Sequence, residues 1–215
     1  MATVKGQEEG KHSIVGALNL VHLGSNQFAD INVKLIPINK AIISRKSRDS
    51  IKEVYKKTGV KLNIDIGNRL QIPQEIWDKE EEDGILNAGD SKIFNKYSEE
   101  EKHIINYYKS HNNEYNEETY YVFITDIKAV NSDTQKSIDG FMPIKSQFGF
   151  LFNGSGNDFK IVAHELGHGI FGLKHPFSEY GTSEGDTNYM MDYGTQEVFN
   201  HMDWKEIFAP GLKLY

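Results

Sequence analysis

The sequence predicts an α+β domain with a partly parallel sheet, and three observations support this class. Ile31 to Asn39 and Val60 to Ile66 carry apolar residues at every second position, which is typical of strands. Ser47 to Thr58 lies between them with its apolar residues on one helical face, and Gly59 provides a stop for that helix. This strand–helix–strand order indicates a right-handed crossover between parallel strands. Tyr120 to Ile127 is rich in aromatic and branched residues, so it predicts a buried central strand.

The segments around these elements carry weaker patterns. Residues 12–24 predict a short helix or a turn. Residues 78–102 are acidic, and we expect a solvated loop over most of that length. Ser98 and Glu101 have the spacing of a capping box, which predicts a helix from about residue 99 to residue 110.

The chain then approaches the segment that carries its most informative motif. A polar connection is expected over residues 131–147. The short apolar run Phe148 to Phe152 precedes a glycine-containing turn and predicts an edge strand. Asp158 or Asn157 is a suitable N-cap for the helix that follows.

The composition places the chain among globular proteins and excludes several functional classes. Hydrophobic residues make up 38% and charged residues 26%, so we expect a single domain spanning residues 1–215. No apolar run approaches the roughly 20 residues of a membrane helix, and no membrane partner is expected. The net charge of −7 argues against a nucleic-acid partner.

Cysteine usage and the N-terminal residues limit the chemistry and the cellular location. The chain contains no cysteine, which excludes disulfides, thiolate metal ligands and a cysteine nucleophile. Met1 to Lys11 has no basic start followed by an apolar segment, so no signal peptide is expected. The chain is therefore expected to be either cytosolic or a piece of a longer exported protein.

The helix after Asp158 contains a His-Glu-x-x-His motif. His164 and His168 are four residues apart, so both imidazoles project from one helical face and can hold a single ion. Zinc prefers nitrogen ligands in a tetrahedral array, and a catalytic site leaves one position open for water. Glu165 lies beside the first histidine and is the candidate general base. Gly172 can end this helix, and His175 lies just beyond it as a candidate third ligand.

The run HELGHGIFGLKH, followed by MMDYG, resembles the metzincins, a family of zinc peptidases. In that family an extended histidine motif binds the metal and a methionine-containing turn lies below it. The resemblance implies that His164, His168 and His175 bind Zn²⁺ and that Glu165 is the general base.

The same resemblance implies roles for two residues of the later segment. Met191 corresponds to the methionine of the turn, which forms an apolar floor under the histidines. Tyr193 corresponds to a tyrosine that approaches the metal in some members. It is expected either to add a ligand or to donate a hydroxyl proton to the oxyanion.

The spacing departs from the family pattern at one point. The family has glycine three residues after the second histidine, whereas this chain has Phe171 there, so that Gly172 and His175 each fall one residue late. A longer last helical turn or a bulge must absorb the extra residue. The third ligand therefore has three alternatives to His175, all of them carboxylates: Glu179, Asp186 and Asp192.

The chain also resembles metallopeptidase domains at the C-terminal ends of large polymorphic toxins of Bacteroidetes. The likeness is strongest over residues 158–194 and weaker over residues 30–66. It implies an effector domain of a secreted parent, delivered into a target cell, with a cognate immunity or inhibitor protein as a partner. A peptidase that processes its own parent polypeptide and an inactive, zinc-stapled binding module are the alternatives.

The resemblances imply a zincin-like fold. We expect a twisted mixed sheet, mostly parallel, packed on two helices, with Phe148 to Phe152 as the antiparallel edge strand that pairs with an extended substrate. Residues 25–172 would form an N-terminal subdomain with the active-site helix, and residues 173–215 a C-terminal subdomain with the methionine turn. The expected activity is that of a zinc metalloendopeptidase acting on proteins or peptides.

Overall fold

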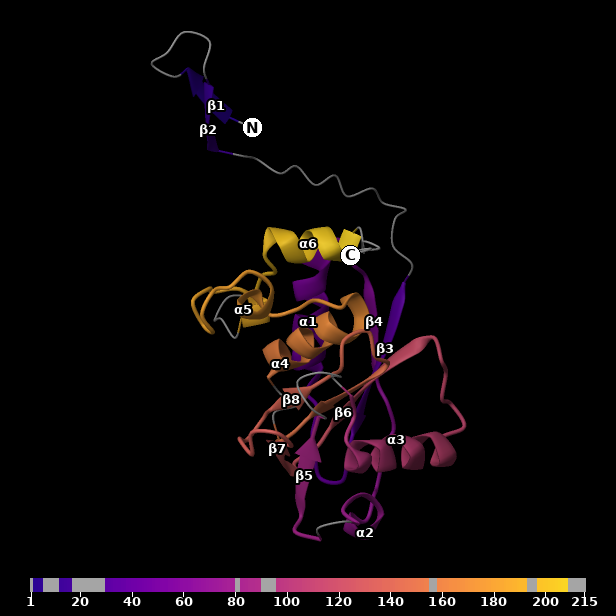
Figure 1. Ribbon diagram of the computed structural model, residues 1–215. Coiled ribbons are helices and arrows are strands. Elements are labelled where there is room, and N and C mark those ends of the chain that lie inside the picture. Colours follow the sequence, from indigo (N-terminus) through magenta and orange to yellow (C-terminus); the bar gives the residue numbers. More distant parts are fainter. Residues whose placement is uncertain are drawn as a thin grey trace.

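The structure is a computed structural model, and the residues it describes fall into seven ranges: 2–5, 12–16, 30–79, 82–89, 96–154, 158–192 and 197–208. A five-stranded mixed sheet forms the centre of the fold (Figure 1). Its strands, in spatial order, are β4 (Leu62–Ile66), β3 (Ile31–Pro37), β6 (Thr119–Ile124), β9 (Phe148–Leu151) and β8 (Gly140–Phe141).

The sheet is parallel except at one edge. Strands β4, β3, β6 and β9 run parallel to one another, with Val33 of β3 opposite both Ile64 and Tyr120. Strand β8 runs antiparallel to β9, with Gly140 opposite Leu151. The expected mixed, mostly parallel sheet with an antiparallel edge is confirmed.

The identity of the edge strand was predicted wrongly. Phe148 to Phe152 forms strand β9, which lies inside the sheet and parallel to β6, and the antiparallel edge is Gly140–Phe141. All four residues of β9 are buried, because helices or strands cover both faces of the sheet at this position. A run that is apolar on both faces is typical of an interior strand, whereas β8 is too short to show a pattern.

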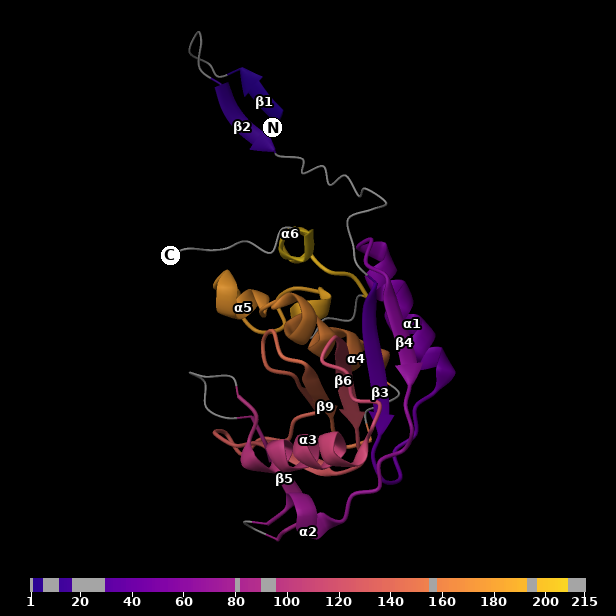
Figure 2. The same cartoon turned by 90° about the vertical axis from the view of Figure 1, so that its right-hand side faces the viewer.

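Two helices cover one face of the sheet. Helix α1 (Arg45–Lys57) connects β3 to β4 in parallel, as the strand–helix–strand pattern predicted. Helix α4 (Phe159–Leu166) packs beside α1 (Figure 2). Their apolar residues share one core cluster with alternate residues of the strands, including Val33, Leu35, Val122 and Ile124.

The opposite face of the sheet is covered by a third helix and a small second sheet. These elements are α3 (Glu99–His111), α2 (Gln74–Trp77), and the parallel pair β5 (Ile85–Ala88) and β7 (Lys128–Asn131). Figures 1 and 2 show α3 and α4 on opposite sides of the central strands. The core on this face is largely aromatic and includes Tyr108, Tyr121, Phe123, Phe148 and Phe150. Strand β5 lies within the acidic stretch that was expected to be a loop.

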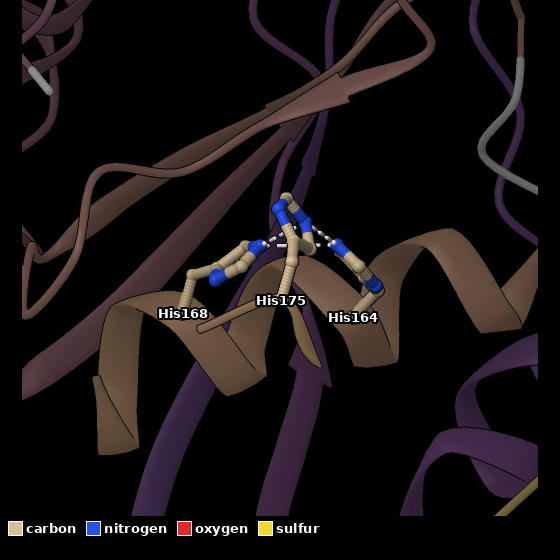
Figure 3. Close-up of side chains that lie close together, drawn as sticks. All are labelled: His164, His168 and His175. Carbon is tan, nitrogen blue, oxygen red and sulfur yellow. Dashed lines mark hydrogen bonds between the residues drawn. The ribbon is translucent and has the colours of Figure 1, made fainter. Parts of the chain in front are cut away.

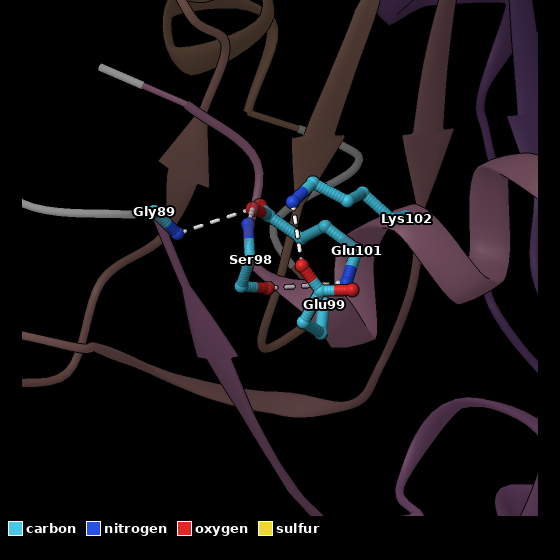
Figure 4. A network of polar contacts seen from close by, with 5 residues as sticks. All are labelled: Gly89, Ser98, Glu99, Glu101 and Lys102. Carbon is cyan, nitrogen blue, oxygen red and sulfur yellow. Dashed lines mark hydrogen bonds and ion pairs between the residues drawn. The ribbon is translucent and has the colours of Figure 1, made fainter. Parts of the chain in front are cut away.

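The capping box at the start of α3 is present as predicted. The Ser98 hydroxyl accepts a hydrogen bond from the Glu101 amide at 3.1 Å, and the Glu101 carboxylate accepts one from the Ser98 amide at 2.9 Å (Figure 4). The same carboxylate oxygen accepts a second bond, from the Gly89 amide at 3.1 Å. Glu101 is fully buried, and this burial raises its pKa to about 8. The cap therefore ties the start of α3 to the end of β5.

The remaining described elements lie at the two ends of the chain. Four short helical segments follow α4: η2 (Gly167–Phe171), α5 (Pro176–Glu179), η3 (Met190–Asp192) and α6 (His201–Phe208). Near the N-terminus, β1 (Ala2–Lys5) and β2 (His12–Gly16) form an antiparallel pair. The helix or turn expected at 12–24 is thus a strand as far as residue 16, and residues 17–24 lie outside the described part. None of the helices in the described ranges has the length and apolar composition of a membrane span.

Candidate metal centre

The helix that carries the histidine motif changes its winding halfway along. Asp158 begins it as the N-cap, accepting a hydrogen bond from the Lys160 amide at 3.0 Å. After α4 the chain continues as a π-helical segment, η2 (Gly167–Phe171), and it ends at Gly172 with φ of 72°. A π-turn holds more residues than an α-turn. The predicted absorption of the extra residue in a longer last turn is confirmed.

This winding brings three imidazoles together. The Nε2 atoms of His164 and His168 are 3.0 Å apart, as are those of His164 and His175, and the His168–His175 pair is separated by 3.1 Å. Figure 3 shows all three rings pointing toward a common centre, two from the helix and one from the segment that follows. Among the described residues, these three form the group of side chains that could hold a metal ion.

The opposite nitrogens of two rings fix their tautomers. Nδ1 of His164 donates to the Met190 carbonyl at 2.9 Å, and Nδ1 of His168 donates to the Leu173 carbonyl at 2.6 Å. In a neutral imidazole this leaves a lone pair on each Nε2. Lone pairs that converge at such distances repel one another unless a cation lies between them. Zn–N bonds of about 2.0–2.1 Å place tetrahedral ligand nitrogens roughly 3.3 Å apart, so the donor set fits such an ion.

Burial keeps the three histidines in the neutral form that binds metals. It lowers the pKa of His164, lowers that of His168 well below the usual value, and lowers that of His175 to about 4. The rings of His164 and His175 lower the pKa of His168 further, and the ring of His164 lowers that of His175. At neutral pH no proton competes with a metal ion for these nitrogens.

The three carboxylates considered as alternatives to His175 lie outside this cluster. Glu179 pairs with the Lys174 ammonium at 3.4 Å, and the Asp186 carboxylate accepts a hydrogen bond from the Ser183 amide at 3.0 Å. Asp192 is fully buried and accepts hydrogen bonds from the amides of two loop residues. His175 is therefore the third candidate ligand. Its ring also stacks on Phe177, with ring centroids 4.7 Å apart.

Glu165 lies in the wall of the cleft next to the histidines. Its side chain is only 6% exposed, and burial raises its pKa to about 8, while a hydrogen bond with the Met142 backbone opposes that rise. A Cβ placed on Gly140 would lie 2.8 Å from the Glu165 Oε1 atom. The carboxyl group is thus held between the helix and strand β8. A cation nearby stabilises the carboxylate form and lowers this pKa.

Met191 lies beneath the histidine helix. It is fully buried in η3, and its sulfur would be 2.9 Å from a Cβ on Gly167, the residue before His168. The adjacent Met190 carbonyl accepts the His164 hydrogen bond described above. The role of Met191 as an apolar floor under the histidines remains a prediction. Tyr193, the other residue expected from this segment, lies outside the described residues.

The three histidines and Glu165 line a cleft of about 840 Å³. One wall comes from β8 and the residues after it, including Phe141, Met142 and Ile144. A polar turn over residues 131–138 contributes to the rim. A cleft of this size accommodates several residues of an extended peptide.

Two features of the site were not anticipated from the sequence. Gly140 and Met142 lie in the stretch expected to be a polar connection, where the apolar pair Phe141-Met142 was the available signal of a strand. Tyr55 of α1 donates a hydrogen bond to the Ala163 carbonyl at 2.6 Å and so fixes the turn that carries His164. A buried Tyr on a helix gives no sequence signal for such a long-range contact.

Comparisons with known proteins identify the fold. No protein-family model and no curated protein matches the sequence. Among solved structures, archaemetzincin from Methanopyrus kandleri is similar with a TM-score of 0.53 and 16% identity, covering 86% of this chain and 96% of that one. A zinc-dependent peptidase from Methanocorpusculum labreanum (strain Z) has a TM-score of 0.50 and 12% identity, covering 81% and 99%. At these identities the likeness shows the fold alone, and that fold is zincin-like.

Proposed function

We propose that this protein is a zinc-dependent peptidase whose metal is bound by His164, His168 and His175 and whose general base is Glu165. One observation carries the proposal: three neutral imidazole nitrogens converge beside a buried carboxyl group in the wall of an open cleft. A structural metal site has no use for such a carboxyl group. The two similar structures are described as an archaemetzincin and a zinc-dependent peptidase, which supports the choice of metal and reaction.

Different residues of the chain would have different roles in peptide hydrolysis. Bound zinc supplies a Lewis acid that polarises a carbonyl and lowers the pKa of water to about 7. Glu165 accepts the proton of the attacking water and later delivers it to the leaving amine. The Met190 and Leu173 carbonyls hold two imidazoles in the required tautomer and orientation. Tyr193 as a donor to the oxyanion remains a prediction.

We propose further that the substrate binds as an extended strand beside β8, the edge strand. Within the described part of the chain, β8 pairs with β9 on one side only, and its residues line the cleft together with Glu165. An extended peptide can form main-chain hydrogen bonds with such an edge. This arrangement supports an endopeptidase, because a strand passing through an open cleft need not present a terminus.

The decisive experiment compares the wild type with Glu165→Gln. Both proteins are expected to hold about one zinc ion, because the three histidines are unchanged. The variant should lose at least about 100-fold in kcat on casein or a peptide library, which is the usual contribution of a general base. Zinc is measured by atomic absorption, and Glu53→Gln on the exposed face of α1 is the matched control.

Each other outcome has a defined meaning. If neither protein holds zinc, the metal site proposed here is wrong. If both bind zinc and neither cleaves a broad library, the domain is either a very selective peptidase or a zinc-stapled binding module. If Glu165→Gln cleaves as fast as the wild type, the carboxyl group is not the base.

For the biological role, we propose an effector domain of a larger secreted protein. The resemblance of residues 158–194 to metallopeptidase domains of polymorphic toxins supports this. Such a domain is expected at the C-terminus of its parent, with a small neighbouring gene encoding an inhibitor that binds the cleft. A position in the middle of the parent instead favours a self-processing peptidase. Failure of the neighbouring gene product to co-purify or inhibit argues against the effector role.

A further inference from the structure

We propose that Met142 is a positioning residue, which holds Glu165 and the π-helical turn of His168 in register with the edge strand. The inference rests on the proposed peptidase function. It concerns a second methionine, distinct from Met191 and on the sheet side of the active-site helix. No resemblance or sequence pattern assigned this residue a role.

The segment that contains Met142 contacts the active-site helix at successive points. Gly140 lies against the Glu165 side chain, and the Met142 backbone hydrogen-bonds with the Glu165 carboxyl group. Three residues later, the Lys145 amide donates to the His168 carbonyl at 3.1 Å. The strand that is proposed to bind substrate is thereby connected to both the base and a metal ligand.

The Met142 side chain fills a space that two glycines leave open. A Cβ on Gly169 would lie 2.1 Å from the Met142 Cε atom and 2.4 Å from its sulfur, and a Cβ on Gly149 of β9 would lie 2.9 Å from that sulfur. Any side chain at either glycine would displace the thioether. Met142 is only 2% exposed. The usual mobility of methionine is thus restricted by close packing on both sides.

The two methionines support the turn of His168 from different sides. Met191 packs against Gly167, and Met142 packs against Gly169. Residues two apart in a helix project about 160–200° from each other around its axis. The turn that carries His168 is therefore held between two thioethers, one from η3 and one from the segment after β8.

A π-helical turn needs this support because its hydrogen bonding is less favourable than that of an α-helix, and it persists where its surroundings enforce it. Here its carbonyls are bonded to Gly172, Leu173 and Lys145. If the space at Met142 were emptied, the turn could rewind and move His168 relative to His175. A displacement near 1 Å is sufficient to reduce a catalysed rate by about 100-fold.

The test compares Met142→Ala and Met142→Leu with the wild type, and Met202→Ala on α6 is the matched control. In the zinc-loaded full chain, we expect Met142→Ala to lower kcat by about 10–100-fold with KM within about threefold. Met142→Leu, which restores most of the volume, should recover much of the loss. The visible spectrum of the cobalt(II)-substituted protein should shift for Met142→Ala and stay unchanged for Met202→Ala.

A second measurement is independent of activity. In the metal-free protein, hydrogen exchange of the amides in residues 167–173 should be at least about tenfold faster in Met142→Ala, with the α1 and α3 amides unchanged. If Met142→Ala fails to fold, Met142→Val provides the same comparison with a smaller cavity. A folded variant with wild-type kcat, cobalt spectrum and exchange rates overturns the proposal. Absence of cleavage by the wild type contradicts the peptidase function instead, and the exchange comparison still decides the role of Met142.

Discussion

Glu165 depends on the absence of a side chain at Gly140. Strand β8 lies against the active-site helix at this glycine, where an added Cβ would be 2.8 Å from both the Glu165 carboxyl oxygen and a methyl carbon of Ile161. The backbone of β8 can therefore approach the base closely enough to define its position. Glycine is required here because the backbone of β8 lies so close to Glu165 and Ile161, and not because the backbone angle is unusual.

Gly140→Ala should consequently impair catalysis while leaving the metal site intact. The added methyl group must displace the Glu165 carboxyl group, because the backbone of β8 is fixed by its pairing with β9. We expect kcat to fall by about 10–100-fold, with zinc content unchanged. Steady-state kinetics and zinc analysis check this result. A variant as active as the wild type would show that the carboxyl group tolerates displacement.

At the scale of elements, the end of the active-site helix decides where His175 lies. Gly172 has φ of 72°, a left-handed conformation that favours glycine, and it directs the chain back toward the cluster. The Leu173 carbonyl, next along the chain, then accepts the His168 hydrogen bond. One backbone angle thus connects the π-helical turn to the third candidate ligand.

Replacing Gly172 should therefore weaken metal binding as well as stability. In Gly172→Ala the left-handed conformation costs about 1 kcal/mol, and the Cβ would lie 2.8 Å from the Lys145 side chain. Gly172→Asn should be milder, because Asn tolerates this conformation better. Urea unfolding and zinc titration of both variants test whether Gly172→Ala loses more stability and more zinc affinity than Gly172→Asn. Equal effects of Ala and Asn would show that contact with Lys145 dominates.

The capping box of α3 predicts a pH dependence of stability. The pKa of Glu101 is raised by burial to about 8 in the folded state, above its usual value of 4.5. Between these two values the folded state binds more protons than the unfolded state, so the contribution of Glu101 to stability falls as pH rises. Below about pH 4.5 this contribution is fully present, and it is lost as pH rises through about 8.

Glu101→Gln should remove this dependence, because the side-chain amide is neutral at every pH and keeps an oxygen acceptor for the backbone amides of Ser98 and Gly89. Relative to the wild type, the variant should become more stable as pH rises from 5.5 to 8.5, by on the order of 1 kcal/mol per pH unit at most. Urea unfolding at both pH values gives the difference. A constant difference between the two proteins would show that Glu101 does not change ionisation on folding.

Considering the whole molecule, the three candidate ligands come from two segments of the chain, and these two segments also pack together in the hydrophobic core. His164 and His168 belong to the helix on the sheet, whereas His175 belongs to the segment that leads to η3 and α6. The core cluster contains Val162 and Leu166 of α4 together with Met191 and Ile207. A bound ion adds a further link between these segments. The predicted division at residue 172 remains a prediction.

Removal of the metal should accordingly lower the thermal stability of the entire domain. A metal ion that binds the folded state and not the unfolded state raises the free energy of unfolding by about 2.7 kcal/mol when the free ion is at 100 times its Kd. We expect EDTA to lower Tm by several degrees, and added zinc to restore it. In His175→Ala the zinc-dependent shift should be much smaller. A wild-type Tm that does not respond to chelation or to zinc would contradict a metal ligand set of three histidines.

Features that depend on local spacing were predictable from the amino-acid sequence. The pairing of His164 with His168 follows from helical periodicity, and the capping box follows from the preferences of Ser98 and Glu101. The parallel β3–α1–β4 unit was predictable because strand and helix periodicities differ. The absorption of one extra residue before His175, by contrast, was implied by comparing this spacing with the pattern of the family that the motif resembles.

The meeting of distant segments at the site became visible in the three-dimensional fold alone. That fold selected His175 over three carboxylates, assigned the sheet edge to Gly140–Phe141 in place of Phe148 to Phe152, and brought Met142 against Gly169. These outcomes depend on contacts between segments that are separated by loops, and the free energy of such contacts comes from packing and burial in three dimensions. A two-residue edge strand and a space between two glycines leave too little pattern in the sequence to be recognised there.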